Sequence, residues 1–115
     1  MKKKVKRDTP TVIHNLTRLV KEFKEWKKSF ETYEEPYCEI TQSEKGIRIS
    51  IKLPQVKRRS ISLRMNSQKM EVTGENGKTN YYRIIDIPPI VDITRARAVF
   101  TNDTLKVTLP YSRAL

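Results

Sequence analysis

The chain has 115 residues, of which 37% are hydrophobic and 32% are charged, a composition typical of one soluble globular domain and not of a disordered chain. Its single cysteine, Cys38, excludes an intrachain disulfide, and we expect the chain to work in the reducing cytoplasm. No run of 18 apolar residues occurs, which excludes a membrane-spanning helix.

The net charge of +11 is concentrated near the N-terminus. Residues 1–30 hold ten Lys and Arg against three Asp and Glu, whereas residues 31–115 hold fourteen against ten. A positive segment attracts nucleic acids and anionic membranes whatever the fold. The same charges could be a solvated face and a lysine-rich tail that keep the chain in solution. We expect residues 1–8 to form a basic flexible tail.

Residues 9–35 are predicted to form an N-terminal amphipathic α-helix and a connector. Thr9 suits the N-cap, and Pro10 suits the first helical position, where its missing N–H costs nothing. Apolar residues then recur at helical spacing. The predicted apolar face consists of Val12, Leu16, Leu19, Phe23, Trp26 and Phe30. This face needs a partner, which could be the chain's own domain, another subunit or a client protein.

From residue 36 to residue 111 the pattern is that of β-strands. Alternating apolar and polar residues are clearest at Ile47, Ile49 and Ile51, and turn signals such as Asn76-Gly77 recur every 6–12 residues. Strands are predicted at residues 37–41, 47–53, 61–65, 70–72, 80–87, 96–100 and 105–109. The predicted fold class is mostly β, an immunoglobulin-like antiparallel β-sandwich preceded by the helix.

The stretch AVFTNDTLKVTLP, residues 98–110, indicates a closing β-hairpin. Its second half alternates, with Leu105, Val107 and Leu109 on one face. Asn102 and Asp103 between the two halves tolerate left-handed backbone angles, so they are suited to the turn.

In this order, the motifs resemble the alpha-crystallin domain of the small heat-shock protein family over about residues 37–110. The motifs are Leu53-Pro54-Gln55-Val56, a basic loop with Ser60-Ile61, Tyr82-Arg83 before Ile87-Pro88, Val91-Asp92, and the closing hairpin. Gln55 and Asp103 stand where the family usually has glycine, so we expect non-glycine residues with left-handed angles at some strain cost. The chain is identified as an atypical short member, similar to archaeal or bacterial ones.

Two assembly devices of that family are missing. Non-animal members carry a long loop with a strand that swaps between partners, but here only residues 74–79 join the two strands. Residues 112–115 are expected to form a short C-terminal tail without the family's Ile-x-Ile motif. We therefore expect a monomer or a homodimer. The CS domains of co-chaperones share this sandwich and also lack both devices.

The resemblance implies a client or partner groove between the strands at 61–65 and 96–100, which no tail of the chain fills. Its residues are Ile61, Leu63, Met65, Ala98 and Phe100. They could equally be ordinary core. Arg83 matches the family's arginine at the dimer contact, or it could be a surface residue in an ordinary ion pair. The basic loop at residues 57–59 could touch phosphates or be merely solvated.

No residues suggest catalysis, a metal or a cofactor. His14 and Cys38 lack a third orienting group, and neither a glycine-rich phosphate loop nor a CxxC pair occurs. The resemblance implies an ATP-independent chaperone of the stress response, a holdase rather than an enzyme, which binds apolar segments of non-native proteins. The alternatives are a CS-domain-like adaptor or co-chaperone, and a nucleic-acid or anionic-surface binder that uses the N-terminal segment.

Overall fold

The computed structural model describes residues 11–12, 17–19 and 33–112. These residues form two packed β-sheets, with two single-turn 3-10 helices at Arg58–Ser60 and Ile93–Arg95. In this part of the chain no helix has the length and apolar character needed to cross a membrane.

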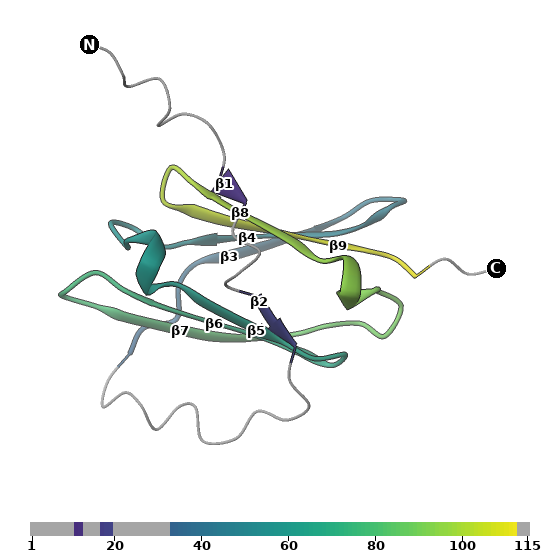
Figure 1. The fold of residues 1–115 in the computed structure, drawn as a ribbon, viewed down its shortest axis with the longest axis horizontal. Coiled ribbons are helices and arrows are strands. Elements are labelled where there is room, and N and C mark those ends of the chain that lie inside the picture. The colour runs from purple at the N-terminus through teal and green to yellow at the C-terminus, as the bar shows by residue number, and fades with distance from the viewer. Residues whose placement is uncertain (1–10, 13–16, 20–32, 113–115) are drawn as a thin grey trace, which may run out of the picture.

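Sheet A has five strands and sheet B has four, and the two lie as layers (Figure 1). In spatial order, sheet A contains β1 (Thr11–Val12), β8 (Arg97–Thr101), β9 (Thr104–Pro110), β4 (Gly46–Lys52) and β3 (Cys38–Gln42). Sheet B contains β2 (Thr17–Leu19), β5 (Ser62–Met65), β6 (Lys69–Glu75) and β7 (Asn80–Asp86). All pairings are antiparallel except β2 with β5. The predicted mostly β, antiparallel architecture is confirmed.

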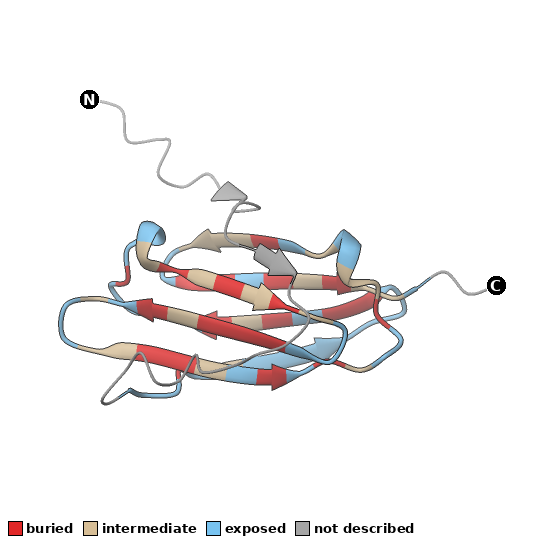
Figure 2. Cartoon of the chain, turned by 60° about the horizontal axis from the view of Figure 1, so that its bottom comes forward, coloured by how far each residue is buried: buried red, intermediate tan, exposed pale blue. Residues whose placement is uncertain are grey.

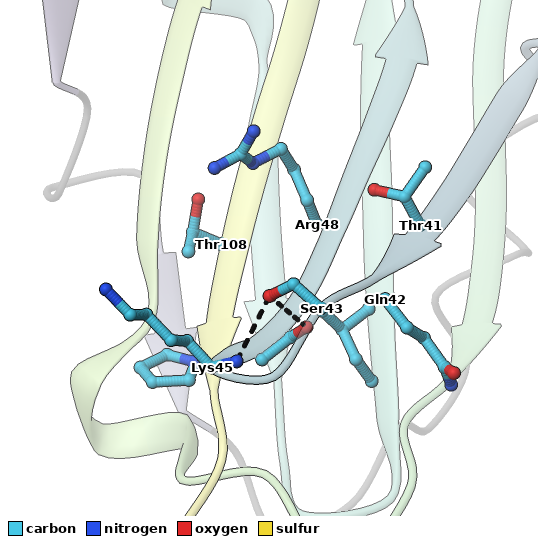
Figure 3. Close-up of a pocket in the computed structure, with 9 residues that line it drawn as sticks. Thr41, Gln42, Ser43, Lys45, Arg48 and Thr108 are labelled. Atoms are coloured by element: carbon cyan, nitrogen blue, oxygen red, sulfur yellow. Dashed lines mark hydrogen bonds between the residues drawn. The ribbon is translucent and has the colours of Figure 1, made fainter.

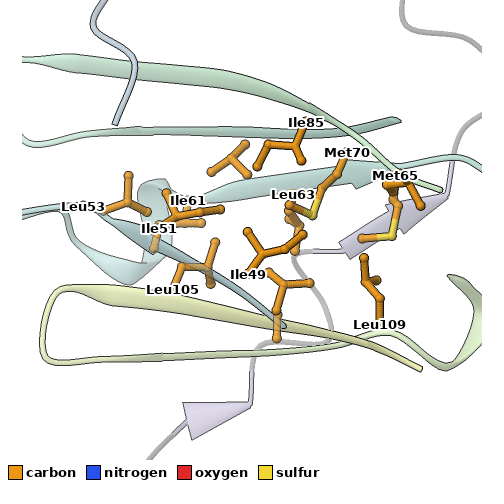
Figure 4. Packing of buried hydrophobic residues seen from close by; sticks show 14 of the residues in the cluster. Ile49, Ile51, Leu53, Ile61, Leu63, Met65, Met70, Ile85, Leu105 and Leu109 are labelled. Atoms are coloured by element: carbon orange, nitrogen blue, oxygen red, sulfur yellow. The ribbon is translucent and has the colours of Figure 1, made fainter. Parts of the chain in front are cut away.

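The core lies between the two sheets and follows from the period-two pattern (Figure 4). Ile49 and Ile51 of β4 face Leu63 and Met65 of β5 across the sandwich, and each is at most 2% exposed. Burying a side chain of this size contributes about 1.5–3 kcal/mol, so the layer of core residues holds the sheets together. Figure 2 shows buried residues alternating with exposed ones along the central strands.

The closing hairpin is present as predicted. β8 and β9 pair from Arg97 opposite Thr108 to Thr101 opposite Thr104. The turn residues Asn102 and Asp103 have φ values of 52° and 62°. Gln55, the other residue that replaces a family glycine, has φ of 60°. The expected left-handed angles are therefore confirmed at both departures from the family pattern.

The connection between β6 and β7 is as short as the sequence indicates. Glu75 pairs directly with Asn80, and the Asn76 carboxamide oxygen accepts hydrogen bonds from the N–H groups of Lys78 and Thr79 at 2.9 Å. Gly77 supplies the positive φ of 93° that the turn requires. This turn leaves no room for an inserted strand between β6 and β7.

The predicted N-terminal helix is not confirmed. Residues 11–12 and 17–19 are extended and form β1 and β2, so the chain is not helical at Val12 or Leu19. Leu16, Phe23, Trp26 and Phe30 lie outside the described residues, as do the predicted tail 1–8, the predicted helix start at residues 9–10 and His14. The β-branched Thr11, Val12 and Thr17 suit strands, and pairing with the sheet edges outweighs the helical spacing of the apolar residues.

Candidate functional site

The edges of β5 and β8 form the candidate binding site, and both are covered by the chain itself. β1 pairs antiparallel with β8, with Thr11 opposite Phe100 and Val12 opposite Val99. β2 pairs parallel with β5, with Thr17 opposite Leu63. β1 therefore lies at the edge of sheet A and β2 at the edge of sheet B (Figure 1). The prediction concerned a C-terminal tail, and the two edges are instead occupied by β1 and β2 from the N-terminal part of the chain.

The five predicted groove residues lie mostly in the core. The side chains of Ile61, Leu63, Met65 and Ala98 are at most 2% exposed. Only Phe100 is partly accessible, and it packs against the same core. This arrangement favours the alternative that these residues are ordinary core. What the two edges offer to a partner is their backbone groups together with Phe100.

The connector before β3 lies along the outer edge of β7. Glu34 forms a parallel bridge with Tyr81, in which Glu34 N donates to Asn80 O at 2.8 Å and Tyr82 N donates to Glu34 O at 3.0 Å. Arg83 donates from Nη1 to the Pro36 carbonyl at 3.2 Å, and the same nitrogen lies 3.6 Å from a Glu35 carboxylate oxygen. Arg83 thus binds its own connector, and a role in a dimer contact stays a prediction.

A buried polar cluster on the outer face of sheet B is absent from the sequence prediction. The Glu71 carboxylate, which is 0% exposed, accepts a hydrogen bond from Arg64 Nε at 3.0 Å. Burial raises the Glu71 pKa, while a hydrogen bond from Tyr82 and the charge of Arg64 lower it. Burial and the Glu71 carboxylate both raise the pKa of Tyr82 well above its usual value. The Tyr82 ring in turn packs edge-on against Tyr33, with ring centroids 5.1 Å apart.

The pairing register of β5 with β6 could have predicted this cluster from the sequence. Arg64 stands opposite Glu71 in the antiparallel pair, and opposite charges at paired positions attract. Both residues occupy the outward positions between core residues such as Leu63 and Met70. A prediction of the register from the alternating pattern would therefore have placed the two charges side by side.

Cys38 and the basic loop 57–59 are the remaining candidates that the structure describes. Burial raises the pKa of the Cys38 thiol, and the nearby Arg83 charge opposes this only in part. Among the described residues no group of three or more His, Cys, Asp or Glu could hold a metal ion. The basic loop 57–59 is exposed and borders a hollow that also contains the Glu75 carboxylate.

Comparisons with known proteins bear on the fold. No protein-family model and no curated protein matches the sequence. Solved structures do match, among them heat shock protein 16.0 from Schizosaccharomyces pombe, with a TM-score of 0.66 at 24% identity over 73% of this chain and 71% of that one. HSP18.5 from E. histolytica matches with a TM-score of 0.64 at 18% identity, over 70% of this chain and 92% of that one.

A small heat-shock protein from Xylella fastidiosa also matches, with a TM-score of 0.66 at 16% identity over 73% of this chain and 92% of that one. These neighbours share the two-sheet sandwich although their sequences differ widely from this one. The resemblance read from the ordered motifs is thereby confirmed at the level of fold. The chain has the β-sandwich fold of the small heat-shock proteins.

Proposed function

We propose that this chain is an ATP-independent molecular chaperone of the holdase type, which binds apolar segments of non-native proteins in the cytoplasm and catalyses no reaction. The observation that carries the proposal is the pairing of two short extended segments, β1 and β2, with the edges of β8 and β5. An edge that accepts an extended segment of this chain offers the same backbone donors and acceptors to a client. The likeness in fold to small heat-shock proteins supports the proposal.

Client binding at these edges is a competition with the chain's own segment. β1 and β2 contain two and three residues, so each covers only part of the neighbouring edge. A client strand that pairs along the whole of β5 or β8 forms more backbone hydrogen bonds than the segment it displaces. Binding of unfolding chains lowers the concentration of free aggregation-prone species, and this protects them without nucleotide.

The test is light scattering of a heat-denatured client mixed with the protein at near-equal molar ratio and without ATP. The full chain is expected to suppress the scattering. A variant that lacks residues 1–19 has both edges uncovered and is expected to protect at a lower molar ratio. The control lacks only residues 1–10, keeps β1 and β2, and is expected to behave like the full chain.

The same assay separates the proposal from its competitors. Absence of protection at every ratio, in the full chain and in the variant lacking residues 1–19, contradicts a holdase. If the apolar residues of the segment 20–32 bind clients, as the sequence predicts, replacing Phe23, Trp26 and Phe30 by serine abolishes protection. That result would move the client site away from the β5 and β8 edges.

A second candidate function is that of an adaptor that docks one partner, as in the CS domains. The observation that favours it is the edge strand β3, which pairs only with β4 among the described strands. Ile40 on β3 is 52% exposed, and the adjacent Tyr37 is 63% exposed. Ile40→Lys should abolish binding of such a partner and leave holdase protection unchanged, because β3 lies at the opposite edge of sheet A from β8.

A further inference from the structure

The outer face of sheet A is strongly basic. On β4, β8 and β9 the positions between the core residues point away from sheet B, and four of them are exposed cations. We call Arg48, Lys52, Arg97 and Lys106 the basic face. Most of the other outward positions on these three strands carry hydroxyl groups: Ser50, Thr101, Thr104 and Thr108.

The register sets the spacing of these cations. Arg97, Thr108, Arg48 and Thr41 stand opposite one another on β8, β9, β4 and β3, so they form one row across the sheet. Neighbouring strands are about 4.8 Å apart, which places Arg97 and Arg48 roughly 10 Å apart at the backbone. Lys106 lies opposite Ser50, one strand over and two residues along from Arg48. The cations are thus spread over the face instead of clustered at one point.

A hollow at one end of the basic face adds polar groups suited to an anion. It has a volume of about 360 Å³, and its lining includes Lys45, Arg48, Ser43, Thr41 and Thr108. In Figure 3 the Arg48 side chain extends from β4 toward β9, where Thr108 lies. Cations beside hydroxyl groups are the side chains that contact phosphate oxygens in nucleic-acid complexes.

The four cations are not neutralised by other described residues. The ion pairs of this part of the chain use Arg64, Lys69, Arg83 and Arg95, all outside the basic face. Lys52 Nζ contacts only a hydroxyl, donating to Thr104 Oγ1 at 3.3 Å. Among the outward positions of the described strands β3, β4, β8 and β9, Glu39 is the one acidic residue. The charge of the face is therefore available to a partner.

We propose that the basic face binds a nucleic acid strand through its phosphate backbone. A polyanion matches cations that are spread over a hydroxyl-bearing sheet face, and each neutralised phosphate releases a counterion. A membrane surface fits less well. Charge alone attracts anionic lipid, but the outward positions of β4, β8 and β9 carry no exposed large apolar residue that would enter the bilayer and strengthen the attraction. This site consists of outward side chains of β4, β8 and β9, whereas the proposed client site consists of the backbone edges of β5 and β8.

The test compares two variants of the full chain with equal net charge. The face variant carries Arg48→Gln, Lys52→Gln, Arg97→Gln and Lys106→Gln. The matched control carries Lys57→Gln, Arg58→Gln, Arg59→Gln and Lys78→Gln, which remove four exposed charges from loops and the β6–β7 turn. Fluorescence anisotropy with a labelled 20-nucleotide single strand, repeated over a series of salt concentrations, measures affinity and its salt dependence.

The full chain is expected to bind the strand at low salt, and the face variant at least tenfold more weakly than the control. The slope of log affinity against log salt should fall by about 3 in the face variant, because each phosphate contact contributes about 0.7 for a single strand. Arg48→Lys with Arg97→Lys keeps the charges and should keep most of the binding. Circular dichroism checks that each variant is folded.

Three outcomes overturn the proposal. Equal weakening of the face variant and the control assigns the effect to net charge or to the loop 57–59, and not to the basic face. If the full chain does not bind the oligonucleotide at low salt, the basic face is not a nucleic-acid site. Binding of phosphatidylserine vesicles without binding of the oligonucleotide assigns the face to a lipid surface instead.

Discussion

Among the residues that the structure describes, three other than glycine have left-handed backbone angles: Gln55, Asn102 and Asp103. The hydrogen-bonding side chains of Asn and Asp stabilise such angles locally, but Gln has no comparable short-range contact. The strain at Gln55 therefore lowers the stability of the native state. Gln55 lies in the turn that follows β4. Leu53, the first residue after β4, is in the core, and its N–H donates a hydrogen bond to Asp103 O at 2.8 Å.

Gln55→Gly is expected to stabilise the protein by about 0.5–1 kcal/mol. Glycine removes a strain of about 1–2 kcal/mol, and its greater freedom in the unfolded chain offsets part of the gain. For a domain of this size the melting temperature should rise by roughly 4 °C. Thermal unfolding followed by circular dichroism measures the change.

The control for this change is Gln68→Gly, at an exposed turn position without a positive φ. It should lower stability by about 0.5–1 kcal/mol through unfolded-state entropy alone. A decrease of similar size at Gln55 would mean that its backbone angle is not strained.

At the scale of the elements, the ladder between β5 and β6 joins a buried carboxylate to a nearly buried guanidinium. The Arg64 side chain is 11% exposed, and Glu71 is fully buried. Removing the cation leaves the carboxylate without its compensating charge in a site where water cannot reach it. Removing both charges relieves that penalty, so the two substitutions should not be additive.

Arg64→Met is expected to destabilise the protein by about 3 kcal/mol, and the addition of Glu71→Gln should restore part of this loss. Glu71→Gln retains an acceptor for the Tyr82 hydroxyl. Urea unfolding of the two single variants and the double variant gives the coupling. Equal losses in Arg64→Met and in the double variant would show that the ion pair contributes little.

The same variants have a defined pH dependence. The folded-state pKa of Glu71 is raised above 4.5. Over a pH interval just above 4.5 the native state therefore still holds the Glu71 proton, which the unfolded chain has already released. Stability from this group is therefore full below pH 4.5 and falls as the pH rises through the raised value. Arg64→Met should extend that fall to higher pH, and Glu71→Gln should remove it.

The sequence predicts the central strands better than the ends of the chain. Alternation at Ile47, Ile49 and Ile51 placed β4 to within one residue, because a strand between two neighbours must bury every second side chain. The short segments that became β1 and β2 carry apolar residues at spacings compatible with a helix as well. Whether these segments form strands or a helix depends on the edges of β8 and β5 that they can pair with. The local sequence pattern contains no information about such distant edges.

The candidate site shows the same limit. Leu63 and Ala98 were predicted to line a groove, and the strands that carry them are where the resemblance placed them. Their side chains face the core, since inward positions of a sandwich are filled by the opposite sheet. The basic face was equally present in the alternation of Arg48 and Lys52 with isoleucines. The full set of four cations can be recognised only when the register of the strands is known, because the register places Arg97 and Lys106 beside Arg48 and Lys52.

At the scale of the molecule, the covered edges predict a small assembly. β1 and β2 occupy the edges of β8 and β5, and the connector at Glu34 covers part of β7. Open edges promote association between chains, and covered ones do not. Among the described strands β3 keeps an uncovered edge, which allows association of few chains. Light scattering coupled to size-exclusion chromatography should give the mass of a monomer or a dimer.

Removal of residues 1–19 should shift this mass upward, because two edges become available to other molecules. The variant that lacks residues 1–10 keeps its edges covered and should elute with the full chain. An assembly of twelve or more subunits from the full chain would contradict the prediction.

The pairing of Thr11 with Phe100 also sets the order in which the protein can fold. β1 is synthesised before β3 to β7, but its partner strand β8 is synthesised after them. Until β8 has been made, β1 has no edge to pair with, while β3 to β7 can already form hairpins from neighbouring residues. Contacts between distant residues form slowly, so docking of β1 is expected to be a late step in folding. A newly made chain would thus pass through a stage in which its sandwich is built and its edges are still open.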